Sequence, residues 1–245
     1  NNALLYNFKA MDKTLQMDIA DAVIDRPKGF SVGRRHFCLY PLTLGKMYLT
    51  QRVMQNLGVD YGNLNVNPYA EALRLAKTKR DDCLALIAYH SLKDKEQVLN
   101  TRTVATRKGI LGKELDESDI ATLLMMCIMS DRTHEFIHEL GIDKELQRMN
   151  EVLKAKQSNN TFQFGGKSVY GTLIDNACER YGWTFDYVVW GISYTNLQML
   201  LKDSVKSVYL TDDEMKKCGI RNKRNIIDGN DQEAMREVIR SHSWK

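Results

Sequence analysis

The sequence has few prolines, no closely paired cysteines and no long hydrophobic run. Three prolines and 15 glycines in 245 residues exclude a collagen-like or proline-rich chain. The five cysteines form no Cys-X-X-Cys pair, so we expect reduced thiols and no cysteine-based zinc site. No apolar run approaches the roughly 18 residues of a membrane span, and no signal peptide is visible. We therefore expect a cytoplasmic protein without a membrane partner.

The composition is that of a folded protein with an ordinary core. Hydrophobic residues make up 43% of the chain and charged residues 27%, which suits one large domain or two small ones. The net charge of +4 is small, and the basic residues are scattered among acidic ones. Because no helix carries a basic stripe, we do not expect a nucleic-acid partner.

Apolar residues recur at helical spacing over most of the chain, which predicts a mainly α protein. The one exception is 30–40, where alternation around a Gly-Arg turn predicts a small N-terminal β-hairpin. Thr43 and Gly58 bracket one predicted helix, which carries Leu44, Met47, Tyr48 and Met54 on one face. The other predicted helices are 11–26, 68–90, 116–128, 131–141, 143–156, 168–181, 196–209, 212–218 and 231–241. Asp116 and Ser118 can cap the helix at 116–128, which we expect at the centre of the core because it is apolar on more than one side. Thr211 and Glu214 form a capping box before the helix at 212–218.

The polar segment 154–161 is the best candidate for a linker, because it contains few hydrophobic residues. It predicts two parts: a hairpin and helical domain over 1–157, and a helical region over 158–245. A second polar, basic stretch covers 219–230.

His134, Glu135 and His138 form an HExxH pattern, the sharpest catalytic motif in the chain. On a helix, the two histidines share a face and can bind one zinc ion, with Glu135 as the base that activates a bound water. Gly141 fits the extended form of the motif, but the third ligand position holds Lys144, whose ammonium cannot bind zinc. The alternative is a solvated helix face that carries two histidines, so we assign no cofactor and no catalytic residue.

The segment 165–168, Gly-Gly-Lys-Ser, is similar to the end of a phosphate-binding loop. Thr161 stands where that loop needs a glycine, and no strand core precedes it. We therefore expect a glycine turn followed by a helix that Ser168 caps.

Aromatic residues are densest between 181 and 194. Helical spacing can place Trp183, Tyr187, Trp190 and Tyr194 on one face. Tryptophan and tyrosine are enriched at binding hot spots, so these four residues are the candidate protein-binding surface. The competing interpretation is a packed core around a turn at 191–193.

Three segments carry a family resemblance: FSVGRRHFCLYPLTLGK at 30–46, FGGKSVYGTLID at 164–175 and YGWTFDYVVWGISY at 181–194. The chain resembles the tail assembly chaperones of long-tailed phages and prophages of gut bacteria. The resemblance implies a helical, non-enzymatic protein in the cytoplasm of the bacterial host, which binds tape-measure and tail-tube proteins during tail morphogenesis. Two alternatives stay open: a zinc metallopeptidase built on the HExxH pattern, and a structural component of the virion tail.

Overall fold

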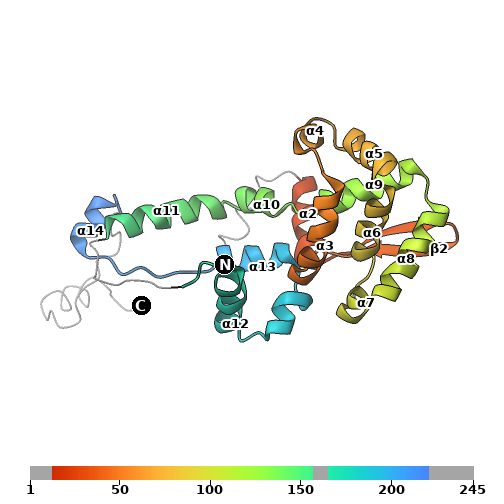
Figure 1. The fold of residues 1–245 in the computed structure, drawn as a ribbon. Coiled ribbons are helices and arrows are strands. Elements are labelled where there is room, and N and C mark those ends of the chain that lie inside the picture. The colour runs from red at the N-terminus through yellow and green to blue at the C-terminus, as the bar shows by residue number, and fades with distance from the viewer. Residues whose placement is uncertain (1–12, 157–164, 221–245) are drawn as a thin grey trace, which may run out of the picture. The chain divides into compact units, whose positions relative to one another are not determined.

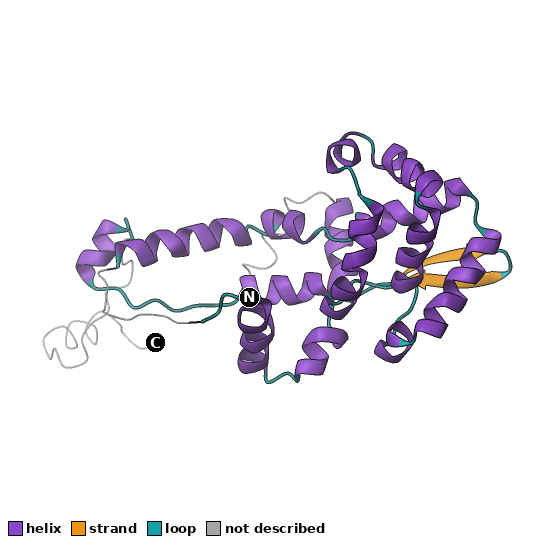
Figure 2. Cartoon of the chain, viewed as in Figure 1, coloured by secondary structure: helices purple, strands orange, loops and turns teal. Residues whose placement is uncertain are grey.

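The computed structural model describes residues 13–156 and 165–220. This part is mainly helical with one two-stranded antiparallel sheet, which confirms the predicted fold class (Figure 2). In chain order the elements are α2 (Lys13–Val23), β1 (Lys28–Val32), β2 (Arg35–Leu39), α3 (Leu44–Leu57), α4 (Tyr61–Val66), α5 (Pro68–Thr78), α6 (Arg80–His90), α7 (Lys95–Leu99), α8 (Thr101–Glu114), α9 (Glu117–Ile128), α10 (Thr133–Glu139), α11 (Ile142–Ala155), the π-helical segment η1 (Tyr170–Asp175), α12 (Asn176–Tyr181), the π-helical segment η2 (Tyr187–Gly191), α13 (Tyr194–Lys202) and α14 (Asp212–Lys217).

The hairpin forms where alternation predicts it. Phe30 pairs with Phe37 across the strands, and the two rings lie 5.7 Å apart between centroids. Gly33 has a φ of 59°, so a glycine suits the tight turn between the strands.

The helix predicted after Thr43 is confirmed as α3. The Thr43 side chain accepts a hydrogen bond from Lys46 N at 3.4 Å, and Gly58 ends the helix with a φ of 60°. The face that carries Leu44, Met47, Tyr48 and Met54 is not buried throughout, because Tyr48 is 54% exposed. The buried residues of α3, which packs against α6, include Lys46, Thr50 and Leu57, spaced at four and seven residues.

The single helix predicted over 68–90 is wrong, because the chain breaks at Lys79 into α5 and α6. Lys79 has a φ of −133°, which is outside the helical range. The two halves have different partners: α5 lies along α9, whereas α6 packs against α3, α8 and α9 (Figure 1). The Arg80 guanidinium donates to Leu115 O at 2.7 Å, which fixes the start of α6 beside the end of α8.

The main core lies where α5, α6, α8 and α9 meet the hairpin. Its most deeply buried side chains include residues from five helices, namely Leu57, Leu75, Leu86, Ile87, Leu111, Ile120 and Leu124. A capping box at Asp116 and Asp119 starts α9, as expected for this central helix.

A second, smaller core joins α3 to residues far along the chain. Leu44 packs there with side chains of η1, α12, η2, the turn after η2 and α13, namely Ile174, Ala177, Val188, Ile192 and Leu197. Thr43 forms a backbone bridge with Ser193, and Tyr194 N donates to Leu42 O at 2.7 Å. Helix α3 therefore joins the two cores, with Leu44 at its start in the second core and Leu57 at its end in the main core.

Contacts divide the chain into two compact units that do not follow chain order. One unit comprises 1–144 and 163–204, and the other comprises 145–162 and 205–245. The predicted boundary at 157/158 and the second half of the predicted linker lie outside the described residues. Helix α11 reaches Ala155, so the first residues assigned to the linker are helical.

The remaining helix predictions have mixed outcomes. The helix predicted over 196–209 is α13, which ends earlier, at Lys202. The capping box at Thr211 and Glu214 is confirmed at the start of α14. The helix predicted over 231–241, and most of the basic stretch 219–230, lie outside the described residues. No helix in the described ranges is long and apolar enough to cross a bilayer.

Candidate protein-binding groove

Three of the aromatic rings between 181 and 194 lie against one another. The Tyr181 and Trp183 rings are stacked with centroids 4.6 Å apart, and Trp183 meets Tyr187 edge-on at 5.1 Å. Gly182, with a φ of 65°, ends α12 and turns the chain between the stacked rings. The structure thus brings together two of the four residues predicted for the protein-binding surface, Trp183 and Tyr187.

Trp190 has different neighbours, because its ring lies flat on the first turn of α3. A Cβ atom placed on Gly45 would lie 2.6 Å from the Trp190 ring, so only glycine leaves room for this contact. Tyr194 packs against the second core, where burial raises the pKa of its hydroxyl. Helical spacing predicted that the four aromatic residues share one continuous face. In the structure they do not.

Tyr187 and Trp190 line a groove of about 460 Å³ together with residues from the other end of the chain. The loop after β2 contributes Tyr40 and Pro41, and α3 contributes Lys46. At the rim, Lys95 forms an ion pair with Asp186, which ties α7 to the residues before η2. Seven of the fifteen lining residues are charged, so the groove combines aromatic and prolyl side chains with four acidic and three basic ones.

Lys46 is a functional candidate that the sequence did not single out. Its side chain is 2% exposed, and burial lowers the pKa of its ammonium to about 8, although the charge of Asp94 acts in the opposite direction. Its Nζ lies 5.6 Å from the centroid of the Tyr40 ring. A signal was present in the sequence, because Lys46 precedes Thr50 by four residues and Leu57 by eleven, which places it on the buried stripe of α3.

The HExxH pattern lies on α10 with its three key side chains exposed, as the solvated-face interpretation expected. Both oxygens of Glu135 accept hydrogen bonds of 2.6 Å from the Arg132 guanidinium, and these bonds lower the pKa of Glu135. His138 Nδ1 lies 2.7 Å from a carboxylate oxygen of Asp143. Glu135 is thus occupied as an ion-pair partner.

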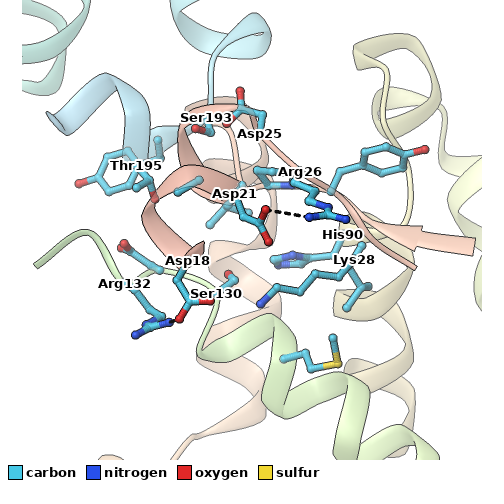
Figure 3. Close-up of a pocket in the computed structure, with 18 of the residues that line it drawn as sticks. Asp18, Asp21, Asp25, Arg26, Lys28, His90, Ser130, Arg132, Ser193 and Thr195 are labelled. Carbon is cyan, nitrogen blue, oxygen red and sulfur yellow. Dashed lines mark hydrogen bonds and ion pairs between the residues drawn. The ribbon is translucent and has the colours of Figure 1, made fainter. Parts of the chain in front are cut away.

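Arg132 also pairs with Asp18 on α2, beside a small pocket of about 120 Å³. Figure 3 shows Lys28 extending across this pocket below His90, toward the side where Asp18 lies. Burial lowers the pKa of His90 to about 3. Over residues 13–156 and 165–220, no three histidine, cysteine, aspartate or glutamate side chains are placed to hold a metal ion.

The Gly-Gly-Lys-Ser segment forms the expected glycine turn, with a φ of 90° at Gly165 and 66° at Gly166. Gly171 N donates to Ser168 Oγ at 3.5 Å, so Ser168 caps the following helical turn as predicted. The residues before Gly165 that a phosphate-binding loop would need lie outside the described ranges.

Comparison of the whole chain with models of protein families, with curated proteins and with solved structures finds no match.

Proposed function

We propose that the chain is a non-enzymatic assembly chaperone for a phage tail, which binds tape-measure and tail-tube proteins in the cytoplasm of the bacterial host. The resemblance of 30–46, 164–175 and 181–194 to tail assembly chaperones motivates the proposal. The mainly helical fold is compatible with it, because such a chaperone covers apolar surface of a long helical partner reversibly.

The observation that carries the proposal is the aromatic wall of the groove. Tyr187 keeps 44% of its surface exposed although its ring also contacts Trp183. Trp190 and Tyr40 line the same groove and are half-buried. Aromatic side chains around a shallow concavity are typical of protein-binding hot spots. A volume of about 460 Å³ suits a few side chains of a partner.

The direct test is co-purification with the tape-measure protein that the same phage or prophage encodes. We expect the tagged chain to retain that protein, and Tyr187→Ala to weaken binding about tenfold or more, as at a hot spot. Tyr170→Ala is the matched control, because Tyr170 belongs to the same unit, is 66% exposed and does not line the groove. Circular dichroism of both variants shows whether the fold is kept.

Equal weakening by both substitutions, or retention of binding by a folded Tyr187→Ala variant, contradicts the groove as the binding surface. The location of the protein after assembly separates the chaperone from a virion component. A chaperone is absent from purified particles, whereas a structural component of the tail is found in them.

A further inference from the structure

Three lysines line the groove, and among the described residues Lys95 forms an ion pair, with Asp186, whereas Lys46 and Lys93 form none. Lys46 forms part of the groove wall and is 2% exposed. Among the described residues, the structure records neither an ion pair nor a hydrogen bond for Lys46 Nζ, only the contact with the Tyr40 ring. No fully buried side-chain nitrogen or oxygen among the described residues lacks a hydrogen-bond partner, so Lys46 Nζ keeps contact with the solvent of the groove, where a ligand can reach it. An ammonium held on a mostly buried side chain gains from an anionic partner.

The position of Lys46 in α3 adds further positive potential at this end of the groove. Lys46 lies in the first turn of a 14-residue helix, where the backbone amides already create positive potential. Acidic side chains usually occupy this turn, but the first turn of α3 contains none. The helix end and the ammonium together favour an anion at this end of the groove.

We propose that the groove binds an acidic side chain of the partner protein, with its carboxylate at Lys46 Nζ and a neighbouring apolar residue against Tyr187 and Trp190. This inference rests on the proposed function, because it takes the occupant to be a polypeptide. Carboxylates are the anionic groups that an unmodified polypeptide offers, and the aromatic wall suits the apolar side chain beside one.

Acidic groups of the groove oppose such a ligand, and they make the proposal testable. Asp94 attracts Lys46 from a distance too great for an ion pair, and its side chain makes no capping hydrogen bond in α7. Asp186 is paired with Lys95, and Asp25 accepts a hydrogen bond from Asn196 at 3.0 Å. The other charged or titratable groups near Lys46 are Lys93, Glu96, Tyr40 and His90. Burial keeps His90 neutral at pH 7.

The first experiment measures binding of two blocked tripeptides, acetyl-Leu-Glu-Leu-amide and its glutamine counterpart, by isothermal titration calorimetry. We expect the glutamate peptide to bind about tenfold more tightly, and Lys46→Met to abolish the difference. Asp94→Asn removes the opposing charge but keeps a good N-cap residue, so it should tighten binding of the glutamate peptide about threefold. Lys46→Met should also fold, because it replaces a buried charge by an apolar chain of similar length.

A second measurement on the unmodified protein follows the proton that a bound carboxylate requires. Near pH 8, about half of the Lys46 side chains are neutral, so binding of the glutamate peptide should take up as much as about half a proton per chain. Titrations in two buffers with different ionisation enthalpies measure this uptake. Lys46→Met should take up none.

Equal binding of the two peptides, absence of binding, or an unchanged preference in Lys46→Met overturns the proposal. Stronger binding of inorganic phosphate than of the glutamate peptide also overturns it, because the occupant is then a free anion. If the tape-measure protein still binds Lys46→Met but not Tyr187→Ala, the carboxylate site is wrong and the proposed function stands. If the glutamate peptide binds and the tape-measure protein does not, the site stands and the proposed function fails.

Discussion

Replacing Gly45 by alanine is expected to destabilise the protein through the Trp190 ring. A Cβ on residue 45 would lie 2.6–2.7 Å from three ring carbons of Trp190, closer than real Cβ contacts come. The backbone of Gly45 is helical, so without the tryptophan the same substitution would stabilise α3 by up to about 1 kcal/mol.

The two effects oppose each other, and their sizes decide the sign. Forcing extra carbon into a packed contact costs about 1–3 kcal/mol. Trp190 is only half-buried, so its ring can relieve part of the overlap by moving toward the groove. We therefore expect Gly45→Ala to lower the free energy of unfolding by about 1 kcal/mol after the gain in helix propensity.

Gly109→Ala is the matched control for the gain in helix propensity when alanine replaces glycine. Gly109 lies inside α8, is exposed, and a Cβ there would meet no atom within 4 Å. We expect this variant to gain about 0.5–1 kcal/mol, so the two alanine variants should shift the urea midpoint in opposite directions. Far-ultraviolet circular dichroism follows both transitions.

A double-mutant cycle with Trp190→Leu attributes the loss to the contact itself. With the large ring removed, Gly45→Ala should cost little or should stabilise the chain, giving a coupling energy of about 1 kcal/mol or more. If Gly45→Ala stabilises as much as Gly109→Ala, or if the effects of the two changes add, the ring is not packed on this glycine.

Two further predictions concern acidic side chains. The Glu71 carboxylate accepts hydrogen bonds from Arg74 Nε at 2.8 Å and from Asp60 N at 2.9 Å, and the bond from Arg74 is the main cause of its lowered pKa. The stability that the ionised Glu71 contributes is present above the unfolded pKa of about 4.3 and is lost as the pH falls through the folded pKa. Between pH 7 and pH 3, the melting temperature of Glu71→Gln should therefore fall less steeply than that of the unmodified protein. Parallel plots of melting temperature against pH for the two proteins would contradict this. Asp116→Ala should lower the free energy of unfolding by about 1 kcal/mol, because Asp116 caps α9 by accepting a 2.8 Å hydrogen bond from Asp119 N. Asp116→Asn should lose little stability, because asparagine is also a good N-cap residue. Urea midpoints test this, and equal midpoints for the two variants would exclude the cap as the cause.

The sequence predicted those features whose causes are local. The caps at Thr43, Asp116 and Thr211 depend on residues three positions apart, and all three start helices in the structure. The break at Lys79 was missed because the apolar spacing continues through it, and only the different partners of α5 and α6 require the break. Tertiary packing overrides helical periodicity there.

The candidate site was predicted less completely, because it joins distant parts of the chain. Local aromatic density pointed to Trp183 and Tyr187 as neighbours, and their rings contact one another, whereas their role in binding stays a prediction. The Trp190 ring packs on Gly45, which is distant in the sequence, so the periodicity within 181–194 could not predict this contact. Lys46 was missed because a lysine in a first helical turn is normally solvated, and its burial depends on the groove that forms around it.

The backbone bridge between Thr43 and Ser193 can form only late in the synthesis of the chain. Ser193 is added 150 residues after Thr43, which takes about 8–30 s at ~5–20 residues per second. Throughout that interval, Leu44 and Gly45 have neither the second core nor Trp190 to cover them. Translation that stops before residue 190 should therefore release chains in which Leu44 and Gly45 stay uncovered, and we expect a larger share of such products than of the full chain to sediment as aggregates.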